Sequence, residues 1–207
     1  MMIHACPNVK TVKSIAFHEA MTQLKNEGRI RYVGLSNHGS NWDSDPEESM
    51  EKVLLAAAED GRFDVMLLAY NFMAREMGEK VLKICNEKKI GTTLMKTDPI
   101  SLYLEIKNSV EETKKEGKEV SKYYKNLLPR LEKKSVAGVD FMKKFNLSNP
   151  KEIRDAAIRF ALNNPYVNTI CKTYNNFDDV ESYIKLSGSH YSKLSEIKLA
   201  VYAQAYG

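Results

Sequence analysis

The residues best suited to chemistry in this sequence stand directly after short apolar runs. His4 follows the apolar residues 1–3, and Ser36 and Asn37 follow the run 32–35. A serine beside an asparagine offers hydrogen-bond donors and acceptors in a fixed arrangement, as the binding of an amide group requires. Both residue types are also common in ordinary loops at strand ends, and a lone histidine near a terminus is seldom catalytic. The pattern by itself therefore leaves a functional and a purely structural interpretation open.

The cysteines and histidines show no spacing typical of a metal site or of a disulfide framework. The three cysteines, Cys6, Cys85 and Cys171, are far apart and form no CxxC pair. None of the four histidines has a ligand-like spacing to Cys, Asp or Glu, so we expect no metal. We expect His18 and His190 on the surface of helices. An odd number of cysteines fits a reducing compartment, and a cytoplasmic location is expected.

Composition and charge are those of an ordinary soluble domain, with 43% hydrophobic and 28% charged residues. No apolar run approaches the roughly 18 residues of a membrane span, and the N-terminus does not resemble a secretory signal. Residues 105–144 hold 11 Lys and Arg against 7 Asp and Glu, and so account for the net charge of +4. Basic and acidic residues alternate there, which favours a solvated helix over a nucleic-acid or membrane surface.

Short apolar runs alternate with helical stretches along the chain. The runs are apolar on both faces, which is typical of a parallel sheet covered by helices. Five such units fit either a partial (β/α) barrel or an open doubly wound sheet. One helix should begin with Asn149 as its N-cap and Pro150 in its first turn. Strands are predicted at residues 1–5, 32–36, 64–70, 91–95 and 166–170, and helices at 12–25, 47–58, 78–89, 150–162, 178–186 and 195–205.

Residues 98–148 interrupt this rhythm, because about 50 residues stand where one helix is usual. They are predicted to form a helical insertion in a single domain that spans residues 1–207. An overhang at the mouth of the barrel, where it lines a substrate pocket, is an alternative to a solvated helix. The insertion contains an amphipathic helix with apolar residues at positions 120, 123, 124, 127, 128 and 131 and a Lys-rich polar face.

The stretch at residues 24–38, LKNEGRIRYVGLSNH, resembles a hallmark of the aldo-keto reductases that closes the fourth helix and forms the fifth strand of a barrel. The resemblance favours the barrel over the open sheet and implies a partial (β/α) TIM-type barrel of about five parallel strands. It places residues 1–6 on the fourth strand, which in this family ends with Ile-His, as Ile3-His4 does here. The chain is therefore expected to begin in the middle of the barrel, without strands one to three. Further matches lie at residues 63–71, 91–97, 157–165 and 167–170, corresponding to the sixth and seventh strands, the seventh helix and the eighth strand.

The resemblance implies a carbonyl oxidoreductase that uses NAD(P)H. In this family a tyrosine acts as general acid, a lysine and an aspartate lower its pKa, and a histidine polarises the substrate oxygen. Only the histidine has a counterpart, His4, because the other three lie before the fourth strand. We therefore expect a truncated enzyme that is inactive alone and that takes a small carbonyl substrate when a complementing N-terminal half is supplied. The alternative is a non-catalytic remnant barrel, an interaction protein that closes its edges as a homo-oligomer or with a partner.

The same resemblance implies a site for NADPH, with NADH as an alternative. Ser36 and Asn37 match the pair that binds the nicotinamide carboxamide. Met95 matches a residue that packs on the nicotinamide ring. A core methionine is the alternative interpretation. Lys172 could contact a 2′-phosphate. The implied cofactor-binding residues are Ser36, Asn37, Met95, Lys96, Thr97, Lys172 and Thr173.

Three positions depart from the family pattern. Leu67 replaces a glutamine that contacts the carboxamide, and it offers no hydrogen bond. Asp179 stands where an arginine is usual, and its charge would repel a phosphate. Ser182 and Tyr183 replace a Glu-Asn pair that holds adenine. Cofactor binding is therefore expected to be weakened or lost.

Overall fold

A computed structural model describes residues 1–39, 48–122, 124–129, 132, 150–174 and 176–206. The chain forms two compact units, which are described separately below. The first comprises Met1–Tyr70, Ala74–Thr97 and Ala161–Val180, and the second comprises Asn71–Met73, Asp98–Phe160 and Glu181–Gly207. The predicted insertion, residues 98–148, belongs to the second unit, and its residues 123, 130–131 and 133–148 lie outside the described part of the chain.

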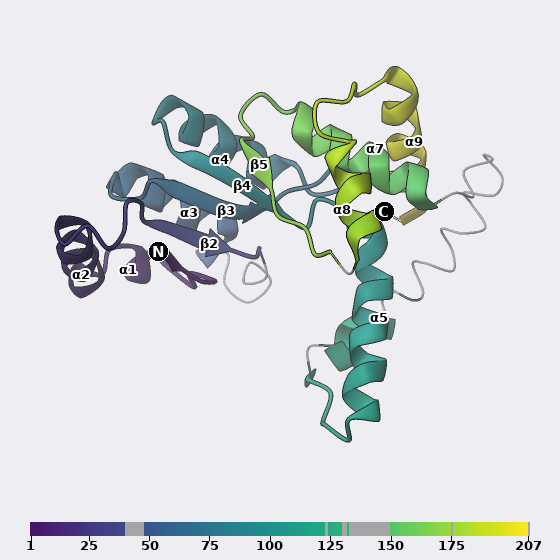
Figure 1. Cartoon of the computed structure of the whole chain (residues 1–207), viewed down its shortest axis with the longest axis horizontal. Coiled ribbons are helices and arrows are strands. Elements are labelled where there is room, and N and C mark those ends of the chain that lie inside the picture. Colours follow the sequence, from purple (N-terminus) through teal and green to yellow (C-terminus); the bar gives the residue numbers. More distant parts are fainter. Residues whose placement is uncertain (40–47, 123, 130–131, 133–149, 175, 207) are drawn as a thin grey trace. The chain divides into compact units, whose positions relative to one another are not determined.

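The first unit is built on a sheet of five parallel strands whose order in space follows their order in the chain (Figure 1). This confirms the predicted α/β class with five parallel strands, as in part of a TIM-type barrel. The strands are β1 (Met2–Ile3), β2 (Gly34–Asn37), β3 (Val65–Ala69), β4 (Gly91–Met95) and β5 (Thr169–Ile170).

The two faces of the sheet differ in burial. In β3 the side chains of Met66 and Leu68 are completely buried, whereas Val65, Leu67 and Ala69 are partly exposed. Successive residues of a strand point to opposite faces, so the buried pair marks the face that the helices cover. Helices α3 (Met50–Asp60) and α4 (Glu76–Glu87) lie side by side on it (Figure 1). The expectation that strands would be buried on both faces is therefore wrong for β3.

The helix predicted at residues 12–25 is two helices, α1 (Val9–Val12) and α2 (Ile15–Asn26). The division follows from two N-caps, because Asn8 accepts a hydrogen bond from the Thr11 N–H and Ser14 accepts one from the Phe17 N–H.

His18 is buried, not exposed as expected from its helix. Its Nε2 lies 2.8 Å from the Val12 carbonyl oxygen at the end of α1, and its ring packs edge-on against Phe63. The short α1 therefore supplies the polar partner that allows this histidine to be buried. His190 is exposed as predicted, but it lies beyond the end of a helix.

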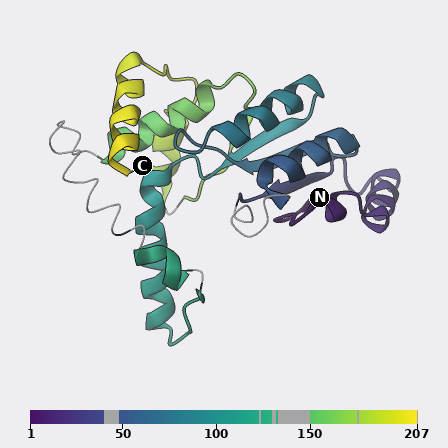
Figure 2. The same cartoon turned by 180° about the vertical axis from the view of Figure 1, so that it is seen from behind.

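The second unit contains α5 (Pro99–Lys115), followed by a helical segment that includes residues 124–129. Both views show the two packed against each other (Figures 1 and 2). The apolar positions predicted here are buried together where they are described, since Tyr124, Leu127 and Leu128 pack against a cluster of Ile106, Val110 and Val120. Val120, which was predicted within the helix, lies just before it.

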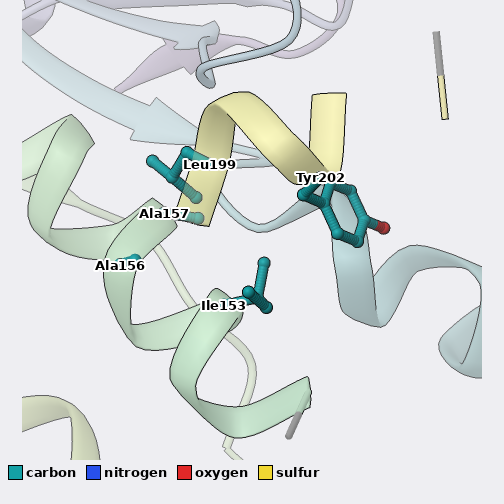
Figure 3. Packing of buried hydrophobic residues seen from close by; sticks show 5 residues of the cluster. All are labelled: Ile153, Ala156, Ala157, Leu199 and Tyr202. Carbon is teal, nitrogen blue, oxygen red and sulfur yellow. The ribbon is translucent and has the colours of Figure 1, made fainter. Parts of the chain in front are cut away.

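A second cluster joins α7 (Pro150–Asn163) to α9 (Lys193–Tyr206). Pro150 begins α7 as predicted, whereas the proposed N-cap Asn149 lies outside the described residues. Two alanines on α7 leave room for the larger side chains of α9 (Figure 3). The cluster comprises Ile153, Ala156, Ala157, Leu199 and Tyr202.

The helix predicted at residues 178–186 is α8 (Phe177–Ile184). In the described ranges of the chain, none of the helices is long and apolar enough to span a membrane.

Candidate functional site

The predicted site residues gather at one edge of the sheet in the first unit. The carboxyl ends of parallel strands meet at the same edge, which is where barrels of this kind place their functional groups. His4 follows β1, Ser36 and Asn37 end β2, and Met95 ends β4. The others lie within three residues after the ends of β4 and β5 and are Lys96, Thr97, Lys172 and Thr173. The structure thus brings all of the predicted positions to one edge, although their roles remain predictions.

Ser36 and Asn37 are both buried and join β2 to the segment after β1. Ser36 Oγ accepts a hydrogen bond from the Ala5 N–H at 2.8 Å, and Asn37 Nδ2 donates to the Cys6 carbonyl oxygen at 3.0 Å. Asn37 Oδ1 accepts from the Gly39 N–H at 2.9 Å. Each group keeps further capacity, since the Ser36 hydroxyl can still donate its proton and the Asn37 amide has a second N–H. The pair therefore has a structural role, and its binding of an amide remains a prediction.

Ala5 lies in an unusual backbone conformation between these contacts. Its φ is +50°, in the left-handed region that residues other than glycine seldom adopt. The Ala5 N–H bond to Ser36, together with a 2.7 Å bond from the Cys6 N–H to the Ser36 carbonyl oxygen, holds this turn. Such strain persists only where surrounding contacts enforce it and is concentrated at functional sites.

His4 and His38 form a pair at the ends of β1 and β2. Their Nε2 atoms are 3.3 Å apart, and the rings meet edge-on with centroids 5.3 Å apart. His4 is exposed, whereas His38 is partly buried. Burial, followed by the charges of Lys96 and His4, lowers the pKa of His38 below its ordinary value. Sequence reasoning assigned no role to His38, because its contact with His4 depends on two strands that are 34 residues apart.

The segment after β4 contributes a cation and an unsatisfied hydroxyl. Lys96 Nζ donates to the His38 carbonyl oxygen at 2.9 Å, and burial lowers the pKa of this lysine. Thr97 is fully buried, and its Oγ1 has no hydrogen-bond partner within the described ranges. A buried hydroxyl without a partner is costly unless something else bonds to it. Met95 is nearly buried beside them.

A row of side chains extends from Ser36 across the partly exposed face of the sheet. The strand register pairs Ser36 with Leu67, Leu67 with Thr93, and Thr93 with Thr169. The family's glutamine would therefore lie beside Ser36, where this chain has a leucine. Thr93 is a polar neighbour in the same row that sequence reasoning did not single out, although its place two residues before Met95 puts it on the same face.

The residues expected to bind the adenosine phosphates lie after β5 and at the start of α8. Lys172 is partly exposed and Thr173 is exposed, both after β5. The main-chain N–H of Asp179 donates to Asn176 Oδ1 at 2.9 Å near the start of α8. The Asp179 carboxylate thus stands in the first turn of this helix, where an arginine was the family's usual residue.

In the second unit, Arg154 of α7 contacts the two residues that replace the family's adenine-binding pair. Its Nη2 donates to Ser182 Oγ at 3.2 Å and to Asp155 Oδ1 at 3.0 Å. Its guanidinium lies 5.1 Å from the centre of the Tyr183 ring. Sequence reasoning missed Arg154, because a helical arginine followed by an aspartate gives no sign of a partner 28 residues away.

The described ranges contain no group of three or more His, Cys, Asp or Glu that could hold a metal ion. The residues at the sheet edge do fit the nicotinamide part of a dinucleotide, since Ser36 and Asn37 can bind an amide and Thr97 Oγ1 needs a partner.

Comparison with protein families gives a match over nearly the whole chain. The model of the Aldo/keto reductase family matches residues 2–195. Comparison with curated protein sequences gives no match.

Proposed function

Because this chain belongs to the aldo/keto reductase family, we propose that it forms the cofactor-binding part of a carbonyl oxidoreductase that uses NADPH, or NADH in its place. Membership supports an oxidoreductase-like function, and members of the family generally use NAD(P)H. The observation that carries the proposal is the meeting of an amide-binding pair, Ser36 and Asn37, with an exposed imidazole, His4, at the carboxyl edge of one sheet.

The residues at the carboxyl edge of the sheet contact different parts of the cofactor. Ser36 and Asn37 hold the carboxamide of the cofactor, and Met95 packs against its ring. Thr97 Oγ1 supplies a further hydrogen bond that is unused within the described residues. Lys172 and Thr173 bind the phosphates. When bound, a reduced nicotinamide supplies the hydride for carbonyl reduction.

His4 donates a hydrogen bond to the carbonyl oxygen of the substrate and so stabilises the negative charge that develops there. The same reduction needs an acid that delivers a proton to this oxygen. The resemblance finds no counterpart of the family's tyrosine, lysine and aspartate within these 207 residues. We therefore propose that the chain binds cofactor but turns over a carbonyl substrate only with a complementing segment that carries the preceding strands.

A second function is favoured by the open face of the sheet. Val65, Leu67 and Ala69 of β3 are partly exposed there, and β1 and β5 are each two residues long. Apolar surface and strand edges of this kind promote association. The second candidate is therefore a non-catalytic protein that covers this face by self-association or with a partner.

Titration of the 207-residue chain with NADPH, followed by nicotinamide fluorescence, tests the proposal. We expect saturable binding with a Kd on the order of 1–10 μM, about −8 to −7 kcal/mol. Substitution N37A should weaken binding about fivefold to tenfold, since a hydrogen bond to the cofactor is worth about 1–1.5 kcal/mol. A matched control is N86A, which removes an exposed amide on α4.

Complementation then separates the two candidate functions. Adding a segment with the first three strands of a family member should produce oxidation of NADPH by a small aldehyde. Absence of NADPH binding up to millimolar concentrations would reject the cofactor site, and a stable dimer of the chain alone would favour the non-catalytic function.

A further inference from the structure

The contact between His4 and His38 links the tautomers of the two rings. Two imidazole nitrogens 3.3 Å apart can share a hydrogen bond only if one carries a proton and the other presents a lone pair. Two donors would repel, and two acceptors would leave both lone pairs opposed. The contact therefore requires opposite roles for the two Nε2 atoms.

The proposed function makes His38 the acceptor, because it has the His4 Nε2–H donate to a carbonyl oxygen. Lys96 Nζ is bonded to the carbonyl oxygen of His38 itself, which places a positive charge close to this residue. His38 is also the more buried ring, whereas His4 is exposed. A nearby cation and burial both disfavour a charged imidazole and lower the pKa of His38. A neutral His38 can present the lone pair of Nε2 to His4 when its proton is on Nδ1.

We propose that His38 is a positioning residue for His4, whose Nε2–H it accepts and thereby holds directed toward the carboxyl edge of the sheet. The inference rests on the proposed function in one respect, namely that His4 Nε2–H later donates to a carbonyl oxygen. Before substrate binds, His38 Nε2 occupies the place of that oxygen. When substrate binds, its carbonyl oxygen takes the place of His38 Nε2 as the acceptor, so His4 needs no change of tautomer.

The tautomer of His38 is the most informative observable. Neutral histidine in water prefers the form with the proton on Nε2, and the proposal requires the opposite form for His38. Long-range ¹H–¹⁵N NMR correlation on the full chain at pH 8 distinguishes the two. We expect His38 almost entirely with Nδ1 protonated and His4 with Nε2 protonated.

Substitutions at His4 and His38 remove the donor and the acceptor in turn. In H4L the donor is lost, and His38 should return to the Nε2–H form as its major state. In H38L the acceptor is lost, so the Nδ1–H form of His4 should appear as a minor state. In H38Q the side-chain oxygen can accept, so this minor form of His4 should not appear. H190L, which removes an exposed histidine elsewhere, should change neither ring.

Two results would overturn the proposal. One is a wild-type chain in which both histidines carry their proton on Nε2, and the other is an H4L variant in which His38 does not change. The NADPH titration is independent of these spectra. Opposite tautomers without NADPH binding would establish the pair and reject the proposed function. NADPH binding without opposite tautomers would reject the pair alone.

Discussion

Lys96 Nζ donates a 2.9 Å hydrogen bond to the carbonyl oxygen of His38 and so links the segment after β4 to the segment after β2. Strand β3 lies between these two strands in the sheet, so the bond crosses a whole strand. Lys96 also has a φ of +55°, in the left-handed region. One residue therefore combines a stabilising hydrogen bond with an unfavourable backbone conformation.

Substitutions at Lys96 should separate these two contributions. K96A loses the hydrogen bond and keeps the strained backbone, so the free energy of unfolding should fall by about 1 kcal/mol. K96G also loses the bond but relieves the strain, and it should be more stable than K96A by about 1 kcal/mol. Urea unfolding followed by circular dichroism measures both. If K96G were the less stable of the two, the left-handed conformation at this residue would be refuted.

Asp64 should make stability depend on pH. Burial alone would raise its pKa, but hydrogen bonds from the Lys25 ammonium at 2.7 Å and the Val33 N–H at 2.8 Å hold the pKa of Asp64 below its ordinary value of 3.8. The folded state thus binds this proton less readily than the unfolded state. The resulting stability is fully present above the ordinary pKa and is lost as pH falls through the folded value.

We therefore expect D64N to reduce the free energy of unfolding by about 1 kcal/mol at pH 7, a modest value because the Asp64 side chain is 35% exposed and water weakens the ion pair. The difference between wild type and D64N should shrink as pH falls below the ordinary pKa of 3.8 and be lost as pH falls through the lower pKa of the folded state. Urea unfolding across this range measures it. K25M keeps the bond from Val33 and should lose only part of the stability; an effect of D64N that is constant with pH would contradict the assignment.

The same aspartate shows why the start of one strand was predicted two residues too early. The run at residues 32–36 predicts a strand, and hydrophobicity gives no reason to begin it later. In the structure Val33 N–H bonds to the Asp64 side chain, and Tyr32 is 60% exposed, so β2 begins only at Gly34. By contrast β4 was predicted with its observed bounds, Gly91–Met95.

The edge of the sheet was predictable, but the contacts made there were not. Strand ends could be located from apolar runs, and parallel strands place their carboxyl ends together. The contact of His4 with His38 depends on the rotamers of two side chains. The unsatisfied Thr97 hydroxyl depends on burial by residues distant in sequence, which no local pattern encodes.

Two strand glycines in the same row of the sheet should respond differently to alanine. A Cβ on Gly34 would lie 2.7 Å from the Val65 carbonyl oxygen, and a main-chain oxygen cannot move without disturbing β3. A Cβ on Gly91 would meet its nearest atoms at 3.6 Å, an ordinary contact. We expect G34A to cost about 1–3 kcal/mol or more and G91A to change stability by less than about 1 kcal/mol.

Thermal and urea unfolding of both variants test this difference. Equal losses for the two glycines would show that β2 and β3 are farther apart than the structure places them. NADPH binding by G34A should fall as well, because Ser36 and Asn37 follow this glycine on the same strand.

Leu67 offers a direct test of the site, since the strand register places it beside Ser36 on the partly exposed face. On the proposed function, L67Q supplies an amide where the family has one. A hydrogen bond of about 0.5–1.5 kcal/mol should then tighten NADPH binding about twofold to tenfold. L67M is the matched control, since it keeps the apolar character and similar size without an amide. Fluorescence titration of the three chains compares them. Tighter binding by L67Q than by both others would place the carboxamide next to Ser36, whereas equal affinities for L67Q and L67M would place the cofactor elsewhere.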